Sequence, residues 1–287
     1  MLKSIRVEFS DGNTRTHNDS IEIIKFPAGE SAVKIDDVSQ YLMIDIENTS
    51  AKNICLSVNY DGDMDFIMLL QLTDLIRQLN SSIKINLNIP YLPHSRMDRK
   101  MDEYTCFSLK SMCKILDLCK FNSIKTNDIH SPVAEAILDN LVNISQADTF
   151  HEWADDDVRI ENPCILVAPD AGAAKKIYDF SGDLTVKDVI IANKVRDLKT
   201  GEIVKTEIPD YNAKPGETFW IIDDICDGGR TFIELAKVMR EKYGKEITIN
   251  LYTTHGFYSK GKEVILDVID NIYCAFDFSQ QNKQDMT

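Results

Sequence analysis

The sequence predicts an α/β protein built from two doubly wound domains with mainly parallel sheets. Short runs rich in β-branched and apolar residues alternate with longer segments of helical period, which is the pattern of β-α units around a parallel sheet. The length of 287 residues is sufficient for two domains of ordinary size, each with its own apolar core. Hydrophobic residues make up 44% of the chain and charged residues 27%, as in globular proteins.

The expected strands are the short apolar runs, and the expected helices lie between them. We expect strands at residues 21–26, 41–46, 53–58, 83–92, 164–170, 189–194, 218–224 and 247–256. We expect helices at residues 65–79, 107–119, 171–178, 230–243 and 262–268.

A domain boundary is expected near residue 145. The stretch 140–163 has no strong strand pattern and contains the polar run HEWADDD. The predicted domains are therefore residues 1–145 and 146–287, and the similar β-α texture of the two halves suggests that they share a fold.

The charge balance limits the possible partners. The chain has 32 Lys and Arg against 46 Asp and Glu, a net charge of -14. A surface this acidic repels nucleic-acid backbones and anionic lipid head groups, so we expect no nucleic acid and no membrane as a partner. A small anionic substrate stays compatible, because a local cluster of donors or a divalent cation reverses the local sign.

The cysteines and the apolar stretches indicate a cytoplasmic protein. The seven cysteines are scattered, odd in number and without a C-x-x-C pair, which is typical of free thiols in a reducing compartment. The sequence shows no secretory leader pattern and no apolar stretch near the roughly 20 residues needed to span a bilayer.

The most informative segment is FWIIDDICDGGRTF, residues 219–232. Asp223 and Asp224 stand at the carboxyl end of an expected strand, where ligands bind in open α/β sheets, and adjacent carboxylates can accept hydrogen bonds from vicinal sugar hydroxyls. A turn with a helix behind it follows, and its backbone N–H groups can hold a phosphate. The turn comprises Asp227, Gly228, Gly229, Arg230 and Thr231. The alternative is a polar loop in which Asp227 caps the helix.

This segment resembles the phosphoribosyl-binding motif of type I phosphoribosyltransferases and of ribose-phosphate diphosphokinases. The motif alone does not separate the two groups. The diphosphokinases carry further motifs in a fixed order, and similar segments occur here from about Lys25 to His255.

Three N-terminal segments resemble the nucleotide side of the diphosphokinases. KFPAGE, residues 25–30, is similar to the adenine-contacting loop, with Phe26 to stack on the base and Glu30 to accept from its amino group. PYLPHSRMDRK, residues 90–100, is similar to the family's cationic loop, and its implied ATP-binding residues are Arg96, Met97 and Asp98.

The third N-terminal segment is NDIHSP, residues 127–132, which is similar to an Asp-Leu-His signature of the family. Asp128 and His130 are two apart on what we expect to be an extended strand, so they would share one face. The resemblance gives His130 a place beside the ATP phosphates and the metal.

Two C-terminal segments complete the series. LVAPDAGAAKKI, residues 166–177, resembles the diphosphate-binding loop, which implies that Asp170 binds Mg²⁺ and that the turn of Ala171, Gly172 and Ala173 cradles phosphate. ANKVRD, residues 192–197, followed by a hairpin-like stretch, resembles the loop that delivers a Lys and an Arg to the transferring group; Lys194 and Arg196 occupy those places.

The resemblance implies two domains of phosphoribosyltransferase type and a ribose-phosphate diphosphokinase that uses ATP, ribose 5-phosphate and Mg²⁺. It also implies a homo-oligomer built from dimers, possibly a hexamer. Two alternatives stay open: a non-catalytic, synthase-associated regulatory subunit, and a type I phosphoribosyltransferase that consumes the product. The first domain argues against the transferase, and Lys194 with Arg196 argues against the regulatory subunit.

Overall fold

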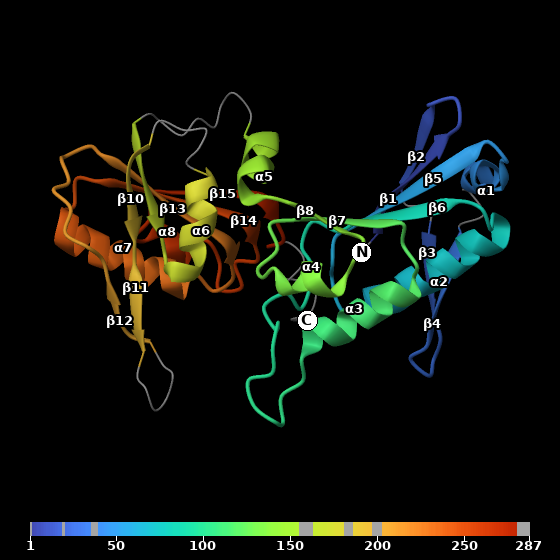
Figure 1. Cartoon of the computed structure of the whole chain (residues 1–287), viewed down its shortest axis with the longest axis horizontal. Helices are drawn as coiled ribbons and strands as arrows, with labels where there is room; N and C mark the ends of the chain where they lie inside the picture. The colour runs from blue at the N-terminus through green and yellow to red at the C-terminus, as the bar shows by residue number, and fades with distance from the viewer. Residues whose placement is uncertain are drawn as a thin grey trace. The chain divides into compact units, whose positions relative to one another are not determined.

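The computed structural model describes residues 2–18, 21–35, 40–154, 163–180, 186–196 and 203–279. The chain divides into two compact units, Met1–Ile144 and Ser145–Thr287. Each unit has its own sheet and its own helices (Figure 1). Within the described residues, the helices are all too short or too polar to cross a membrane.

Unit 1 contains a six-stranded sheet in the order β2-β1-β5-β6-β7-β8. Its strands are β1 (Leu2–Phe9), β2 (Thr14–Asn18), β5 (Ala51–Val58), β6 (Lys84–Asn88), β7 (Ser123–Asn127) and β8 (Leu141–Ile144). The pairs from β5 to β8 are parallel, whereas β1 runs antiparallel to both of its neighbours. A separate antiparallel hairpin is formed by β3 (Ile21–Lys25) and β4 (Ser31–Ile35).

The helices of unit 1 are α1 (Gln40–Glu47), α2 (Met64–Leu79), α3 (Ser108–Leu118) and α4 (Val133–Ile137). In β5, Ile54 and Leu56 are buried while the alternate residues are only half-buried, so one face of the sheet supplies the core. Leu72 and Ile76 of α2 and Leu109 of α3 belong to the same buried cluster. The helices therefore fix the loops that follow β6 and β7.

Unit 2 contains a five-stranded, fully parallel sheet in the order β10-β9-β13-β14-β15. Its strands are β9 (Cys164–Ala168), β10 (Val186–Ile191), β13 (Thr218–Cys226), β14 (Thr248–Gly256) and β15 (Asn271–Asp277). The helices are α5 (Gln146–Trp153), α6 (Ala171–Phe180), α7 (Arg230–Tyr243) and α8 (Glu263–Leu266). A hairpin of β11 (Asn193–Arg196) and β12 (Ile203–Glu207) projects from this sheet (Figure 1).

Both faces of the unit 2 sheet are buried. Phe219 and Ile221 of β13 pack in one cluster with Leu235 of α7, whereas Trp220 of β13 packs in another with Ile177 of α6. Alternate residues of one strand thus enter two cores, as expected for a parallel sheet covered on both sides. This arrangement confirms the doubly wound α/β fold.

Most of the expected elements are present, and one was wrong. The five expected helices correspond to α2, α3, α6, α7 and α8, and all seven cysteines are free thiols. The run YLMIDI, residues 41–46, is not a strand but belongs to α1. Leu42 and Ile46 of this run are fully buried while Tyr41 and Ile44 are exposed, which is a helical spacing of apolar contacts.

Elements without a strong local pattern were missed. They are β1, β2, β4, β7, β8, β15, α1, α4 and α5. Two of them, β8 and α5, lie inside the stretch 140–163 that we had expected to lack strand structure.

The start of α7 depends on a glycine. Gly229 has φ +73, and a Cβ there would lie 2.5 Å from Cγ1 of the buried Ile265 in α8. Both the left-handed conformation and the close contact therefore favour glycine.

We predict that Gly229→Ala destabilises the protein more than Gly216→Ala. Gly216 has φ +81 but nothing within 4 Å of a Cβ, so its substitution carries only the conformational cost, on the order of 1 kcal/mol. Gly229→Ala adds overpacking against Ile265, about 1–3 kcal/mol more. Urea unfolding of both variants measures the difference, and equal losses would contradict the contact.

Candidate active site

The predicted site residues form two groups, one in each compact unit. Most members of each group lie at the carboxyl ends of neighbouring parallel strands, where the loops of an open α/β sheet meet, whereas Phe26, Glu30, Lys194 and Arg196 lie on antiparallel hairpins.

In unit 1, the loops after β6 and β7 form a pocket of about 410 Å³. Four predicted residues line it: Arg96, Met97, Asp98 and His130. The other lining residues are Arg99, Met101, Thr105, Cys106, Ser108, Ser131 and Pro132. The structure thus brings together two motifs that are more than thirty residues apart, and the pocket contains two arginines and a histidine suited to phosphate oxygens.

The backbone on both sides of this pocket is strained. His94, just before the cationic loop, has φ +60, and Asp128, just before His130, has φ +46. Non-glycine residues rarely adopt positive φ, and such residues concentrate at functional sites. The turn after His94 is closed by a hydrogen bond from the Met97 N–H to the His94 carbonyl, 2.9 Å.

The expected extended strand through Asp128 and His130 was wrong. Strand β7 ends at Asn127, and the positive φ of Asp128 turns the chain. Asp128 is buried whereas His130 is exposed, so the two side chains do not share a face. The Asp128 N–H donates to the Ile144 carbonyl, 2.7 Å, and this bond sets the turn that brings His130 into the pocket.

A second histidine, His94, was missed by the sequence reasoning. Its Nε2 lies 2.9 Å from Oδ1 of Asp63, which precedes α2. Hydrogen bonds to the Asp63 carboxylate from Tyr60 and His94 lower the pKa of Asp63. The sequence offered one indication of its place near the pocket, because His94 lies within the PYLPHSRMDRK segment.

Phe26 and Glu30 do not line this pocket. They lie at the turn of the β3–β4 hairpin, where the Phe26 N–H donates to the Glu30 carbonyl, 2.9 Å, and Gly29 has φ +87. The Phe26 ring is 46% exposed, so it is accessible to a ligand or to another chain.

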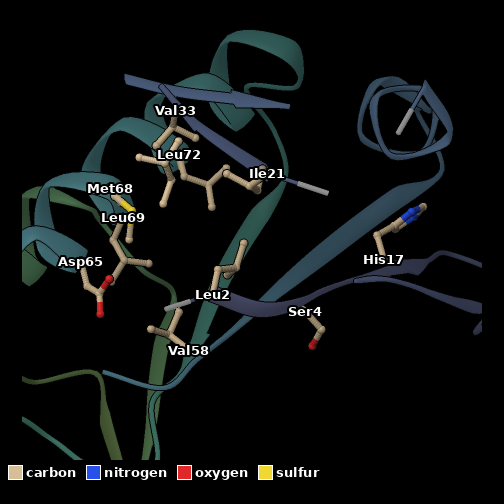
Figure 2. A pocket seen from close by; sticks show the side chains of 11 residues that line it. Leu2, Ser4, His17, Ile21, Val33, Val58, Asp65, Met68, Leu69 and Leu72 are labelled. Carbon is tan, nitrogen blue, oxygen red and sulfur yellow. The ribbon is translucent and has the colours of Figure 1, made fainter. Parts of the chain in front are cut away.

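A different cavity, about 290 Å³, lies between this hairpin, α2 and the sheet. Figure 2 shows Leu72 of α2 beside Ile21 and Val33 of the hairpin strands, and Leu69 of α2 also lines the cavity. Two of its polar side chains have partners: Asp65 accepts from the Asp61 N–H, 2.8 Å, and His17 Nε2 lies 2.9 Å from Asp45 Oδ2. Its mainly aliphatic lining is unsuited to phosphate.

In unit 2, Asp170 lies between the end of β9 and the start of α6. Its Oδ1 accepts from the N–H groups of Gly172 and Ala173, at 3.0 and 3.1 Å. A Cβ at Gly172 would lie 3.1 Å from that same oxygen, so glycine permits this close turn. The predicted diphosphate turn, Ala171 to Ala173, is therefore organised by the carboxylate of Asp170.

Asp223 and Asp224 of β13 lie near Asp170. The Asp224 N–H donates to Asp223 Oδ1, 2.9 Å, and Lys176 Nζ of α6 lies 3.1 Å from Asp224 Oδ2. Burial raises the pKa of Asp223 well above its ordinary value, and the negative charges of Asp224 and Asp170 add to this effect. The sequence analysis did not predict a role for Lys176. Its partner Asp224 is 48 residues away in the chain, so no local sequence pattern indicates the contact.

The turn after β13 leads directly into the N-terminus of α7. Gly229, not Asp227, is the N-cap residue of α7, and no side chain caps the helix. The alternative that Asp227 caps α7 was wrong, because its Oδ1 accepts from the Ser259 hydroxyl, 2.6 Å. Arg230 forms an exposed ion pair with Glu234, 2.7 Å, and Thr231 lies in the first turn of α7. The helix N-terminus is thus available to bind a phosphate.

Lys194 and Arg196 lie on β11 of the predicted hairpin. Lys194 pairs with Thr206 and Arg196 with Ile203 of β12. The side chains of Lys194 and Arg196 lie outside the described residues.

The predicted metal ligands are not gathered into one cluster among the described residues. Within the described residues, no group of three or more His, Cys, Asp or Glu is arranged to hold a metal ion. The predicted ligands His130 and Asp170 belong to different units. The carboxylates of Asp170 and Asp223 are nonetheless hard oxygen donors that fit Mg²⁺, which is usually bound by one or two carboxylates together with substrate phosphates.

These features define an α/β domain of phosphoribosyltransferase type, together with a second α/β unit that has a pocket lined by arginines and a histidine. Residues 134–279 match the phosphoribosyl transferase domain family, and the chain belongs to that family.

Curated relatives match most of the chain. It is 26% identical over 253 residues to a ribose-phosphate pyrophosphokinase of Saccharolobus solfataricus, covering 85% of this chain and 82% of that protein. It is 28% identical over 246 residues to the Pyrococcus abyssi protein of the same name, covering 84% and 78%. The crystal structure of phosphoribosylpyrophosphate synthetase from Mycobacterium smegmatis superposes with a TM-score of 0.68 at 17% identity, covering 88% of this chain and 78% of that one, and so shares the fold.

We predict that Asp223→Asn raises the melting temperature in metal-free buffer at pH 7.5. Because the pKa of Asp223 is raised in the folded state, the unfolded chain loses this proton first, and ionisation costs stability as the pH rises from the ordinary carboxyl range through the raised value. Scanning calorimetry should show a rise of a few degrees at pH 7.5 that disappears near pH 4.

Asp224→Asn is the matched control. It removes the charge paired with Lys176 and also relieves the repulsion on Asp223, so the two effects oppose each other and we expect a smaller rise in melting temperature at pH 7.5 than for Asp223→Asn. If Asp223→Asn and the wild-type protein had the same melting temperature at every pH, the claim that ionisation of Asp223 destabilises the folded protein would be wrong.

Proposed function

We propose that the protein is a ribose-phosphate diphosphokinase, which transfers the diphosphoryl group of MgATP to the anomeric hydroxyl of ribose 5-phosphate. The products are phosphoribosyl diphosphate and AMP. The observation that supports this most is the Arg96 to His130 pocket in unit 1, because a phosphoribosyltransferase has no need of a second phosphate site on another α/β unit. The names of the matched relatives support the same activity.

The ribose 5-phosphate binds in unit 2. Its 5-phosphate lies at the turn from Asp227 to Thr231, where the N-terminus of α7 supplies N–H donors. Its hydroxyl groups donate to Asp223 and Asp224, and Lys176 keeps the second carboxylate in place. The diphosphate binds at the turn that follows Asp170, where the N–H groups of Gly172 and Ala173 would exchange their present acceptor, Oδ1 of Asp170, for the diphosphate.

The ATP binds in the unit 1 pocket. Arg96 pairs with phosphate oxygens, Met97 and Asp98 shape the loop, and His130 lies beside the phosphates. Phe26 and Glu30 contact the adenine from a neighbouring copy of the chain, which fits the exposure of Phe26 and makes the protein a homo-oligomer.

The reaction is an in-line displacement. The anomeric oxygen forms a bond to the β-phosphorus of ATP. The bond between the β-phosphorus and the oxygen that bridges the α- and β-phosphorus atoms breaks, and AMP leaves with that oxygen. The hydroxyl proton passes to solvent. Lys194 and Arg196 stabilise the charge on the transferring group. By the resemblance, Asp170 and His130 would hold Mg²⁺, which would supply positive charge to the phosphates when bound. We place the activity in the cytoplasm.

The activity is tested by incubating the purified protein with MgATP and ribose 5-phosphate and following phosphorus NMR. The proposal predicts AMP and phosphoribosyl diphosphate in equal amounts. A protein that binds both substrates but forms no AMP at any phosphate or metal concentration would instead be a non-catalytic subunit.

We predict that Lys194→Ala lowers kcat by about 100-fold or more while the KM values change little, because its charge acts mainly on the transition state. Lys205→Ala is the matched control, since Lys205 lies opposite Val195 on the same hairpin. Steady-state kinetics of both variants provide the comparison. Equal turnover of the two variants would show that Lys194 has no part in catalysis.

A further inference from the structure

The segment after β14 packs against the turn that precedes α7. The N–H groups of Phe257 and Tyr258 both donate to the Cys226 carbonyl, at 2.8 and 3.3 Å. The Ser259 hydroxyl donates to Oδ1 of Asp227, 2.6 Å. Residues 257–262 are therefore fixed beside the phosphate-binding turn, although some thirty residues separate the two in sequence.

Lys260 lies across the glycine of this turn. A Cβ placed on Gly228 would be 3.4, 3.5 and 3.6 Å from the Cδ, Cε and Cγ atoms of Lys260. Three successive methylene groups at nearly equal distances mean that the side chain runs flat over Gly228. The bond from Cε to Nζ adds only about 1.5 Å, so the ammonium group of Lys260 lies within about 5 Å of the position that a Cβ on Gly228 would take.

The other cations near this turn already have acidic partners. Lys176 pairs with Asp224, Arg230 with Glu234 and Lys262 with Asp277, the last at 2.6 Å. Lys260 is exposed and has no carboxylate within 4.0 Å among the residues that the structure describes. In a chain of net charge -14, it is a cation that can meet an anion at this turn without first breaking an ion pair.

The backbone that presents Lys260 is held in an uncommon conformation. Tyr258 is 4% exposed and has φ +48, a region that bulky residues rarely adopt. The Gly261 N–H donates to the Tyr258 carbonyl, 2.8 Å, and Lys262 Nζ lies 4.7 Å from the centre of the Tyr258 ring. Backbone strain of this kind persists where the surroundings maintain it and is concentrated at ligand sites.

We propose that Lys260 binds the 5-phosphate of the sugar and thereby sets the preference of this site for phosphorylated ribose. The inference rests on the proposed function for the identity of the substrate. A phosphomonoester dianion at the N-terminus of α7 accepts hydrogen bonds from the backbone N–H groups of the helix terminus. It also accepts a hydrogen bond from the ammonium group of Lys260, whose side chain runs over Gly228. Lys260 is a binding residue and not a catalytic one.

The test compares Lys260→Met, Lys260→Arg and Lys237→Met. Methionine keeps an unbranched side chain over Gly228 and removes the charge, arginine keeps the charge, and Lys237 is an exposed lysine of α7 away from the turn. We expect Lys260→Met to raise the KM for ribose 5-phosphate by about 10- to 30-fold, as for the loss of one charge-assisted hydrogen bond. The KM for MgATP and kcat should stay within about twofold, and both other variants should resemble the wild-type protein.

Two further measurements separate binding from packing and from turnover. The KM of the wild-type protein for ribose 5-phosphate should rise more steeply with ionic strength than that of Lys260→Met. Calorimetric titration with ribose 5-phosphate alone, without ATP, measures the affinity without any reaction, and Lys260→Met should show the same 10- to 30-fold loss.

The outcomes distinguish this inference from the proposed function. Turnover by the wild-type protein with an unchanged KM and titration affinity in Lys260→Met would overturn the role of Lys260 alone. Binding of ribose 5-phosphate that depends on Lys260, without any turnover, would support Lys260 and overturn the diphosphokinase proposal. A protein that neither binds nor turns over ribose 5-phosphate would overturn both.

Discussion

The convergence of parallel strands at one edge of each sheet is the constraint on which both candidate sites depend. In unit 2, pairing of β9 with β13 brings Asp170 close to Asp223 and Asp224. In unit 1, pairing of β6 with β7 brings the cationic loop to His130. The parallel strands of β-α units have their carboxyl ends at the same edge of the sheet. Strand pairing therefore brings together short motifs that are far apart in sequence.

Charge determines what these edges can bind. The protein as a whole is strongly acidic, yet the unit 1 pocket contains arginines and the unit 2 turn combines a helix N-terminus with nearby lysines. Asp224 is buried and Asp223 half-buried, and the raised pKa of Asp223 indicates that ionising this carboxyl beside Asp224 costs free energy. Hydrogen bonds from sugar hydroxyls would stabilise the ionised carboxylates. Binding of the sugar would therefore offset part of the free energy that their ionisation costs the folded protein.

The sequence predicted those features that are local in the chain. Strand ends followed by Asp and Gly, as at Asp170 and Gly229, are local signals, and both segments form the turns that were expected. The strand expected at 41–46 was wrong because a short apolar run does not reveal its period until Leu42 and Ile46 are seen buried together. The contacts of Lys176 and Lys260 could not be predicted, because each depends on a partner that only the tertiary fold brings close.

The central claim is that one chain carries two phosphate sites, with ribose 5-phosphate at the turn before α7 and a nucleotide in the pocket of unit 1. Crystals grown with ribose 5-phosphate, Mg²⁺ and a non-hydrolysable ATP analogue test it directly. The account predicts density for the sugar phosphate at residues 227–231 and for the triphosphate beside Arg96 and His130. Density for either ligand at a different place, with these two sites empty, would contradict the account.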